Sequence, residues 1–231
     1  MKKTSAFENR ELILSEDGSS SFYLPDLDET YHNRRGALTE SAFIFIDKGL
    51  RAIIPERKDS MPIKVLEVGM GTALNVLLTQ RFAESEQIQV EMVTLEPYPL
   101  VEREWTQLNY GSILGMEKEL ENLHKAPWDS STKLSPCFEI TKLRTKLEEF
   151  RTDGRTFDVI YMDAYAPSRQ DEIWSTDNLS ILFKSLNRGG SLVTYCAQGQ
   201  FKRNLKLVGF QAEHPPGPLG KKEMTVARKE A

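Results

Sequence analysis

Apolar residues along the chain follow two different periods, one typical of buried strands and the other of helices. Continuous apolar runs at 62–69 and 157–163, each bounded by turn residues, predict buried strands. Residues 72–85, directly after the first run, place apolar side chains at helical spacing. The whole pattern predicts further strands at 88–96, 137–142, 191–197, 210–214 and 221–229, and helices at 99–114, 143–150, 171–187 and 199–209, with less regular chain at 115–136. Because strands that alternate with helices form right-handed βαβ units, we expect an α/β fold with a mostly parallel, seven-stranded sheet.

The two ends of the chain depart from this alternation. No helix separates the last two predicted strands, which suits an antiparallel hairpin at the edge of the sheet. At the N-terminus, residues 11–24 predict two short strands around Asp17 and Gly18, and residues 37–54 predict a helix that ends before Pro55. We therefore expect an N-terminal extension over residues 1–60, packed on a Rossmann-like domain over residues 61–231.

Composition narrows the class of protein. Of the 231 residues, 39% are apolar and 28% are charged, and no apolar run is long enough to span a bilayer. The N-terminus lacks the apolar stretch of a secretory signal, and the two cysteines have no metal-ligand or redox spacing, so a reducing cytoplasm is expected. Three isolated histidines argue against a metal site. A net charge of −4 gives no general support for a nucleic-acid partner. Basic clusters at 34–35, 202–203 and 221–222 gain meaning only if the fold gathers them around one site.

A glycine-rich turn follows the first buried strand. The stretch VLEVGMGTALN places Glu67, Gly69 and Gly71 at the junction of strand and helix, where glycines let a ligand approach the backbone. Glu96 ends the next strand, and an acid there can accept hydrogen bonds from both hydroxyls of a ribose. Glu67 would repel a dinucleotide pyrophosphate but suits a sulfonium cofactor, so the pattern favours S-adenosylmethionine over a nicotinamide. The alternative interpretation of Glu96 is a helix cap before Pro97.

A second candidate site follows the fourth predicted strand. Asp163 ends that strand, at the sheet edge where ligands of open parallel sheets bind. The loop behind it mixes Tyr165, Pro167 and Trp174 with polar residues, which suits the wall of a nucleobase or small-substrate pocket. The alternative interpretation is structural: Asp163 caps the next segment, Pro167 stiffens the loop and Trp174 belongs to the core.

Five blocks resemble one family, in the same order. DAYAPSRQDEIW (163–174) resembles the D-[AG]-[FY]-A-P-x-x-x-P-E-[ML]-W signature of the methyltransferase unit in bacterial tRNA 5-methylaminomethyl-2-thiouridine biosynthesis, the MnmC or MnmD type. The stretch 17–50 resembles its N-terminal block, with Tyr31, His32 and Glu40 in the Y-H-x-x-x-G-A-x-x-E-S core. LEVGMGTALN, GGSLVTYCAQGQFKRNL and GPLGKKEMTVA resemble its glycine turn and its C-terminal blocks. The departures are Ala73 in place of a third glycine, Asp171 in place of a proline, and the lack of a Gly-Asp pair in 137–146, which leaves the adenine contact unassigned.

The resemblance implies the fold of a class I S-adenosylmethionine-dependent methyltransferase and its site residues. The expected cofactor-binding residues are Glu67, Gly69, Met70, Gly71, Thr72, Asn75, Glu96 and Asp163. The expected substrate-binding residues are Tyr31, His32, Glu40, Tyr165, Pro167, Trp174, Arg203, Lys221 and Lys222. Because the chain stops at Ala231, a stand-alone methyltransferase is expected, working after a separate enzyme that supplies its substrate.

The resemblance further implies N-methylation of 5-aminomethyl-(2-thio)uridine at the wobble position of the tRNA anticodon loop. An ammonium group cannot attack a methyl donor, so a carboxylate that orients the amine and accepts a proton is needed, and Asp163 is the candidate. Two alternatives stay open. One is a small-molecule amine methyltransferase or aminopropyltransferase of the same fold, which needs no basic surface. The other is a catalytically silent RNA-binding or scaffold protein, which has no need for the glycine turn and both acids.

Overall fold

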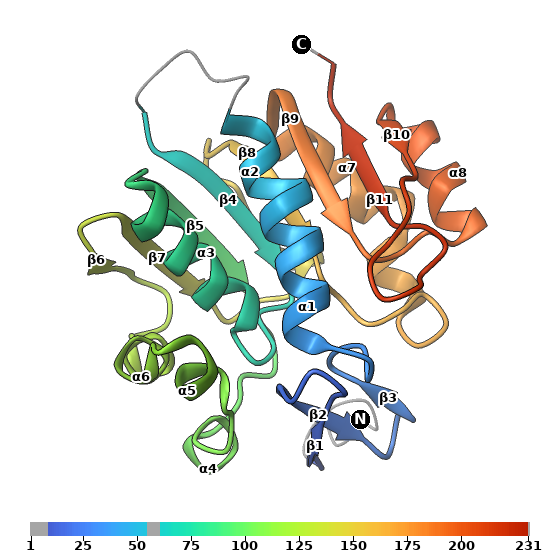
Figure 1. Cartoon of the computed structure of the whole chain (residues 1–231). Coiled ribbons are helices and arrows are strands. Elements are labelled where there is room, and N and C mark those ends of the chain that lie inside the picture. Colours follow the sequence, from blue (N-terminus) through green and yellow to red (C-terminus); the bar gives the residue numbers. More distant parts are fainter. Residues whose placement is uncertain (1–8, 55–60, 231) are drawn as a thin grey trace.

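The strand β4 (Ile63–Val68) lies near the centre of an eight-stranded sheet, in a computed structural model that describes residues 9–54 and 61–230 (Figure 1). Its neighbours on both sides are parallel to it. The order across the sheet is β10 (Gln211–Glu213), β11 (Thr225–Arg228), β9 (Leu186–Thr194), β8 (Phe157–Met162), β4, β5 (Val90–Leu95), β7 (Phe138–Leu143) and β6 (Ser131–Ser135). Strand β11 runs antiparallel to both of its neighbours, as the hairpin prediction requires. The expected α/β, Rossmann-like architecture is confirmed.

The prediction of seven strands was wrong by one, because β6 forms within the stretch 115–136. This edge strand pairs antiparallel with β7. Its sequence, STKLS, is mostly polar and only partly buried, so it carries no apolar alternation that would indicate a strand. Pairing with β7, and not the pattern of its own residues, therefore makes β6 a strand.

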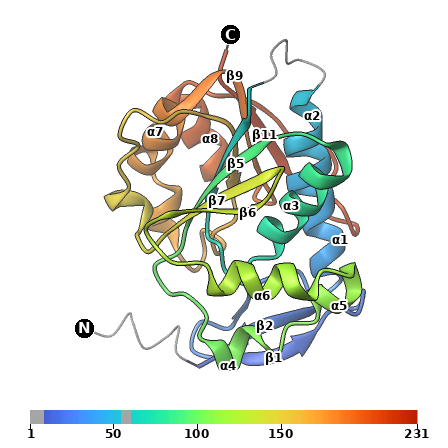
Figure 2. The same ribbon diagram turned by 90° about the vertical axis from the view of Figure 1, so that its left-hand side faces the viewer.

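Helices cover both faces of the sheet (Figure 2). On one face lie α3 (Leu74–Glu86), α6 (Glu117–Lys125) and a continuous helix formed by α1 (Ala37–Ser41), η2 (Ala42–Leu50) and α2 (Arg51–Ile53). On the other face lie α7 (Thr176–Ser185) and α8 (Gly199–Val208). Successive residues of β4 serve the two cores: Val65 joins the first apolar cluster and Leu66 the second. Among the described residues, no helix combines the length and apolarity needed to cross a membrane.

Two predicted helices were wrong in extent. The segment 99–114 divides into α4 (Glu102–Trp105) and α5 (Tyr110–Leu114). Asn109 separates them: its side-chain oxygen accepts from the Ser20 N–H at 2.8 Å and its amide donates to the Gly18 carbonyl. The segment 143–150 holds only the short 3-10 turn η4 (Leu147–Glu149). In the first case, contacts with a hairpin that is distant in sequence replace local helix propensity.

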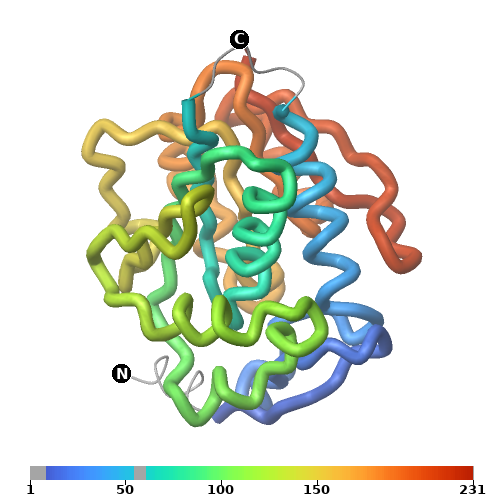
Figure 3. The backbone as a smooth tube through the Cα atoms, turned by 60° about the vertical axis from the view of Figure 1, so that its left-hand side comes forward, coloured from blue at the N-terminus to red at the C-terminus, as the bar shows by residue number. Residues whose placement is uncertain are grey.

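The N-terminal part forms a three-stranded sheet beside α4 and α5, at the carboxyl ends of the main strands (Figure 3). Strands β1 (Glu11–Leu14) and β2 (Ser20–Leu24) make the predicted hairpin, and β3 (Glu29–Thr30) adds a third strand. The turn between β1 and β2 caps helix α1, since Asp17 accepts from the Thr39 N–H at 3.0 Å and Ser19 accepts from the Leu38 N–H at 3.1 Å.

The helix that follows the small sheet packs directly on the main sheet. A Cβ on Gly49 would lie 3.0 Å from Val193 and 3.3 Å from Tyr161, and the ring of Phe45 lies 5.2 Å from that of Tyr161. The N-terminal part and the rest of the chain thus share one apolar core. A boundary between extension and domain at residue 60 stays a prediction, since residues 55–60 lie outside the described chain.

Candidate functional site

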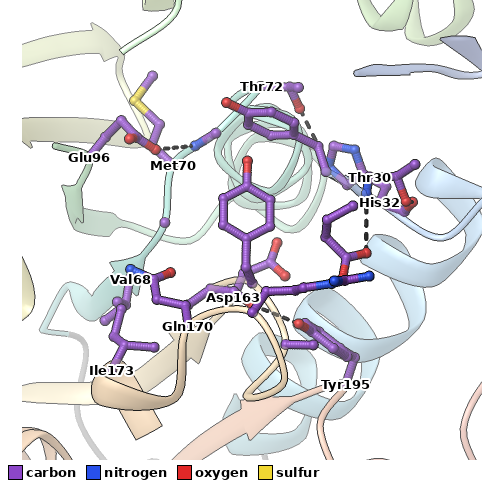
Figure 4. Close-up of a pocket in the computed structure, with 18 of the residues that line it drawn as sticks. Thr30, His32, Val68, Met70, Thr72, Glu96, Asp163, Gln170, Ile173 and Tyr195 are labelled. Atoms are coloured by element: carbon purple, nitrogen blue, oxygen red, sulfur yellow. Dashed lines mark hydrogen bonds and ion pairs between the residues drawn. The ribbon is translucent and has the colours of Figure 1, made fainter. Parts of the chain in front are cut away.

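A cavity of about 920 Å³ lies at the carboxyl ends of β4, β5, β8 and β9 (Figure 4). The N-terminal sheet and the loops that follow these strands line it. Of the residues expected at the site, the cavity is lined by Tyr31, His32, Glu40, Gly69, Met70, Gly71, Thr72, Asn75, Glu96, Asp163, Tyr165 and Lys221. The lining does not include Glu67, Pro167, Trp174, Arg203 or Lys222.

The glycine turn after β4 has two distinct steric requirements. Gly69 has φ +93°, and a Cβ there would lie 2.5 Å from the carbonyl oxygen of Asp163. Gly71 has φ +52°, and a Cβ added there would lie 3.0 Å from the ring of Tyr31. Ala73 stands where the family pattern has a third glycine and also adopts a left-handed conformation, with φ +64°. The turn therefore keeps its shape despite that departure.

Glu96 connects this turn to the loop after β5. One carboxylate oxygen accepts from the Gly71 N–H at 2.9 Å and the other accepts from the Tyr98 N–H at 2.7 Å. Burial raises the pKa of Glu96 above its usual value, although both backbone donors oppose that rise. The nearest following helix begins at Glu102, so the alternative interpretation of Glu96 as a helix cap is wrong.

Glu67 lies beneath the turn and is fully buried. Thr94 donates to its Oε2 at 2.6 Å, and burial raises its pKa to about 8, so that the neutral acid prevails at pH 7. Glu67 lies outside the cavity lining, whereas Asn75 lines the cavity and its Oδ1 is a buried acceptor without a hydrogen-bond partner among the described residues. A buried acceptor at the wall of a cavity suits a ligand that carries hydrogen-bond donors, such as an ammonium group. Asn75 therefore fits the methionine end of S-adenosylmethionine, and Glu96 fits its ribose.

Asp163 lies between Glu96 and Tyr195 in the cavity (Figure 4). Asn75 donates to its Oδ2 at 2.8 Å, and its backbone N–H donates to the Val68 carbonyl. Burial, with a smaller contribution from the nearby Glu40, raises the pKa of Asp163 to about 7, against the opposing effects of the Asn75 hydrogen bond and of Lys221. A carboxylate whose pKa lies near the working pH can accept a proton in the cavity and release it to solvent.

The N-terminal sheet closes the cavity with aromatic and basic side chains. The rings of Tyr31 and Tyr165 meet edge to face at 5.5 Å. Arg10 donates to the Tyr31 hydroxyl at 2.9 Å and forms a buried ion pair with Glu104 at 3.1 Å. No motif marks Arg10 in the sequence, because its partners lie 21 and 94 positions away. This contact holds the N-terminal segment over the cofactor turn.

His32 connects the small sheet to the glycine turn. Its Nδ1 lies 3.0 Å from Ser21 Oγ and its Nε2 lies 3.4 Å from Thr72 Oγ1. Burial lowers the pKa of His32 to about 4, so the ring is neutral at pH 7. These contacts connect His32 to the turn, and His32 also lines the cavity.

The loop after Asp163 divides between cavity and core. Trp174 is buried against Phe201, with ring centroids 5.0 Å apart, and its indole donates to the Tyr165 carbonyl at 2.8 Å. Trp174 thus fixes the backbone that presents Tyr165, which corrects the expectation of a substrate contact and supports the core interpretation. Pro167 likewise lies outside the cavity lining.

Other lining residues escaped the sequence interpretation. Pro97 and Tyr98 after β5, and Thr145, Lys146, Leu147 and Glu148 after β7, line the same cavity beyond Glu96. The only available signal was their place after predicted strand ends. Together they form the wall of the cavity beyond Glu96.

Comparison with known proteins agrees with this geometry. The family described as S-adenosyl-L-methionine-dependent methyltransferase matches residues 102–230, more than half of the chain. The tRNA 5-methylaminomethyl-2-thiouridine biosynthesis bifunctional protein MnmC of Cupriavidus metallidurans is 29% identical over 97% of this chain and 34% of its own length. The same-named protein of Cupriavidus necator is 28% identical over 96% of this chain and 35% of its own length. The chain thus spans about a third of these relatives.

Solved structures show the same fold. The crystal structure of MNMC2 from Aquifex aeolicus superposes with a TM-score of 0.76 over 96% of this chain and 71% of that one, at 20% identity. The CurJ carbon methyltransferase gives a TM-score of 0.51 at 13% identity, over 87% of this chain and 57% of that one. The chain belongs to the family of S-adenosyl-L-methionine-dependent methyltransferases, with S-adenosylmethionine as its methyl donor.

Proposed function

We propose that this enzyme methylates the primary amine of 5-aminomethyl-(2-thio)uridine at the tRNA wobble position, giving 5-methylaminomethyl-(2-thio)uridine. The observation that carries the proposal is Asp163, a carboxylate with a pKa near 7 that lies in one cavity with the cofactor turn. The relatives named for tRNA 5-methylaminomethyl-2-thiouridine biosynthesis support the choice of acceptor.

The order of the strands indicates which end of the cavity holds the cofactor. Because these residues line one cavity, we expect Glu96 to accept from the ribose, Asn75 and the glycine turn to hold the methionine end, and Thr145 and Leu147 to border the adenine. S-adenosylmethionine supplies an electrophilic methyl group on a sulfonium, which is a good leaving group. The protein therefore contributes mainly by positioning, and holding the amine in line with that methyl group supplies much of the rate.

Asp163 serves the acceptor amine. Its carboxylate orients the amine through a hydrogen bond and takes up the proton that the nitrogen must lose. Asn75 fixes the carboxylate from the side of helix α3. The wobble base lies in a single-stranded loop, so unstacking it costs only a few kcal/mol. Tyr165, held edge to face by Tyr31, is placed to support the extruded base.

Basic residues around the acceptor end favour tRNA over a small amine. Arg34, Arg35 and Lys221 line the cavity, and Arg35 donates to the carbonyl of Leu219 in the loop before β11. Arg203 and Lys222, both exposed, lie outside the cavity, where phosphate contacts are the role proposed for them. This proposal includes three further points: the enzyme acts in the cytoplasm, it binds the anticodon loop, and a separate enzyme supplies the aminomethyl group.

Labelled methyl transfer tests the function. The purified enzyme is incubated with methyl-labelled S-adenosylmethionine and tRNA that carries unmethylated 5-aminomethyluridine, and the tRNA is digested to nucleosides. We expect the label in 5-methylaminomethyluridine from the wobble position. Transfer to free amines with none to tRNA would instead select the small-molecule alternative.

The variant Glu96→Gln tests the cofactor end. The amide keeps one acceptor oxygen, but its NH2 group cannot accept, so one of the two backbone hydrogen bonds is lost. The loss of charge also weakens the remaining hydrogen bonds to the backbone and to the ribose. We expect the Kd for S-adenosylmethionine, measured by calorimetry, to rise about tenfold. An unchanged Kd would show that Glu96 only ties the two loops together.

A further inference from the structure

A fixed lysine lies at the acceptor end of the cavity. The Lys221 ammonium forms an ion pair with Glu40 and lies 4.7 Å from the centre of the Tyr195 ring. Glu40 is largely buried and also accepts from Asn33 Nδ2 at 3.3 Å. The ammonium is therefore held by a carboxylate and an aromatic face, two partners that suit a cation.

The loop that carries Lys221 is itself well anchored. Arg35 donates to the Leu219 carbonyl at 3.1 Å, the Gly217 N–H donates to the Lys221 carbonyl at 3.1 Å, and the Met224 N–H donates to the Pro215 carbonyl at 2.9 Å. The backbone just before Lys221 is thus fixed at several points, unlike that of a mobile surface lysine.

The position of this ammonium follows from the order of strands. Glu96 ends β5, the glycine turn follows β4, Asp163 follows β8 and Tyr195 follows β9. Lys221 precedes β11, whose first residue, Thr225, pairs with Thr194 at the end of β9. A cofactor that occupies the β5 and β4 ends leaves the β8 and β9 ends for the acceptor. The Tyr195 hydroxyl donates to the Ala164 carbonyl at 2.7 Å, which keeps its ring beside the Asp163 loop.

We propose that Lys221 is a positioning cation for the reaction: held by Glu40 and Tyr195 next to Asp163, it disfavours a protonated acceptor and so selects the neutral, nucleophilic amine. A primary ammonium brought to Asp163 would lie in the field of a second ammonium, and like charges at short range oppose each other. The amine enters without its extra proton and forms a bond to the methyl carbon as the bond from that carbon to sulfur breaks. The proton that the alkylated nitrogen then loses passes to Asp163. This role rests on the proposed amine acceptor.

Several charged or titratable groups surround the Lys221 ammonium. Those that face it or lie next to its loop are Glu40 of α1, Asp163 after β8, Tyr195 and Cys196 after β9, Arg35 before α1, and the Lys202–Glu223 ion pair. Lys221 lowers the pKa of Asp163, against the rise caused by burial and by Glu40. The cation thus keeps both the base and the amine in their deprotonated forms at lower pH.

The pH dependence of kcat/KM distinguishes this role from simple packing. In Lys221→Met we expect the ascending limb to move up by about one pH unit, which lowers kcat/KM about fivefold at pH 7 and about tenfold well below pH 7, and this loss disappears at high pH. Lys221→Arg keeps the charge and should restore the limb. Lys118→Met, at an exposed position on α6, is the matched control. The proposal would be overturned if the ascending limb of Lys221→Met stayed at the wild-type pH. In that case kcat/KM would fall, or rise, by the same factor at every pH.

A second measurement needs no substrate. The Asp163 carboxyl carbon is titrated by carbon-detected NMR in the free enzyme and in Lys221→Met, where its pKa should rise. An Asp163 titration that does not move would also refute the role of Lys221. If wild-type enzyme methylates no wobble nucleoside, the proposed function fails, and this titration still decides whether Lys221 controls the proton affinity of the site.

Discussion

Replacement of Asp163 by asparagine is expected to lower kcat for methyl transfer by about 10²- to 10⁴-fold, the usual contribution of a positioned general base. Asparagine has nearly the same shape and keeps an oxygen for the Asn75 amide, which donates to Asp163 at 2.8 Å. It cannot take up a proton. The affinity for S-adenosylmethionine, measured by calorimetry, should therefore change only a few-fold while single-turnover transfer to tRNA is nearly lost.

The pH dependence gives an independent check on Asp163. Because its pKa is about 7 in the folded enzyme, well above that of an ordinary aspartate, the wild-type rate should fall as the pH drops below 7. The same shift means that ionised Asp163 destabilises the fold: its contribution to stability is full below about pH 4 and is lost as the pH rises through 7. Asp163→Asn should thus be at least as stable as wild type at pH 8.

A control at the other end of the same strand separates catalysis from structure. Asp158 is the second residue of β8, and it accepts from the Lys64 N–H at 2.9 Å and from Asn187 at 2.8 Å, outside the cavity lining. Asp158→Asn should reduce stability and leave the transfer rate nearly unchanged. Equal loss of cofactor binding and transfer in Asp163→Asn would assign Asp163 a structural role instead.

Apolar runs were sufficient to predict the parallel part of the sheet. Strands such as β4 and β8 are buried on both faces, so their composition alone identifies them. Elements defined by distant partners were not predictable. Strand β6 is polar and exists through its pairing with β7, and Asn109 interrupts a helical pattern because it binds a hairpin some 90 residues away. Local periodicity contains no information about either partner.

The candidate site shows the same division. Glycines and acids at strand ends could be predicted because the topology of a parallel sheet brings all carboxyl ends to one edge, as for Gly71, Glu96 and Asp163. The roles of the N-terminal residues could not, since nothing in the sequence shows that Arg10 reaches Glu104. The sequence also does not show which way an aromatic side chain in a loop points, and Trp174 is buried in the core.

Gly69 is the position where a single methyl group should do the most structural damage. Its φ of +93° is strained for any other residue, and an added Cβ would lie 2.5 Å from the carbonyl oxygen and 3.1 Å from the carbonyl carbon of Asp163. Both are backbone atoms of the loop after β8, which cannot move aside as a flexible side chain can. In Gly69→Ala we therefore expect the free energy of unfolding to fall by about 3–5 kcal/mol.

The clash also links the two halves of the site, because Gly69 belongs to the cofactor turn and Asp163 to the acceptor end. Separation of these loops should reduce cofactor affinity and transfer together, by more than about a hundredfold. Gly154→Ala is the matched control: Gly154 has φ +82°, but a Cβ there meets nothing within 4 Å. It should show only the left-handed backbone penalty of about 1–2 kcal/mol. Urea denaturation of both variants measures the difference, and equal destabilisation would mean that the loops after β4 and β8 are not in contact as described.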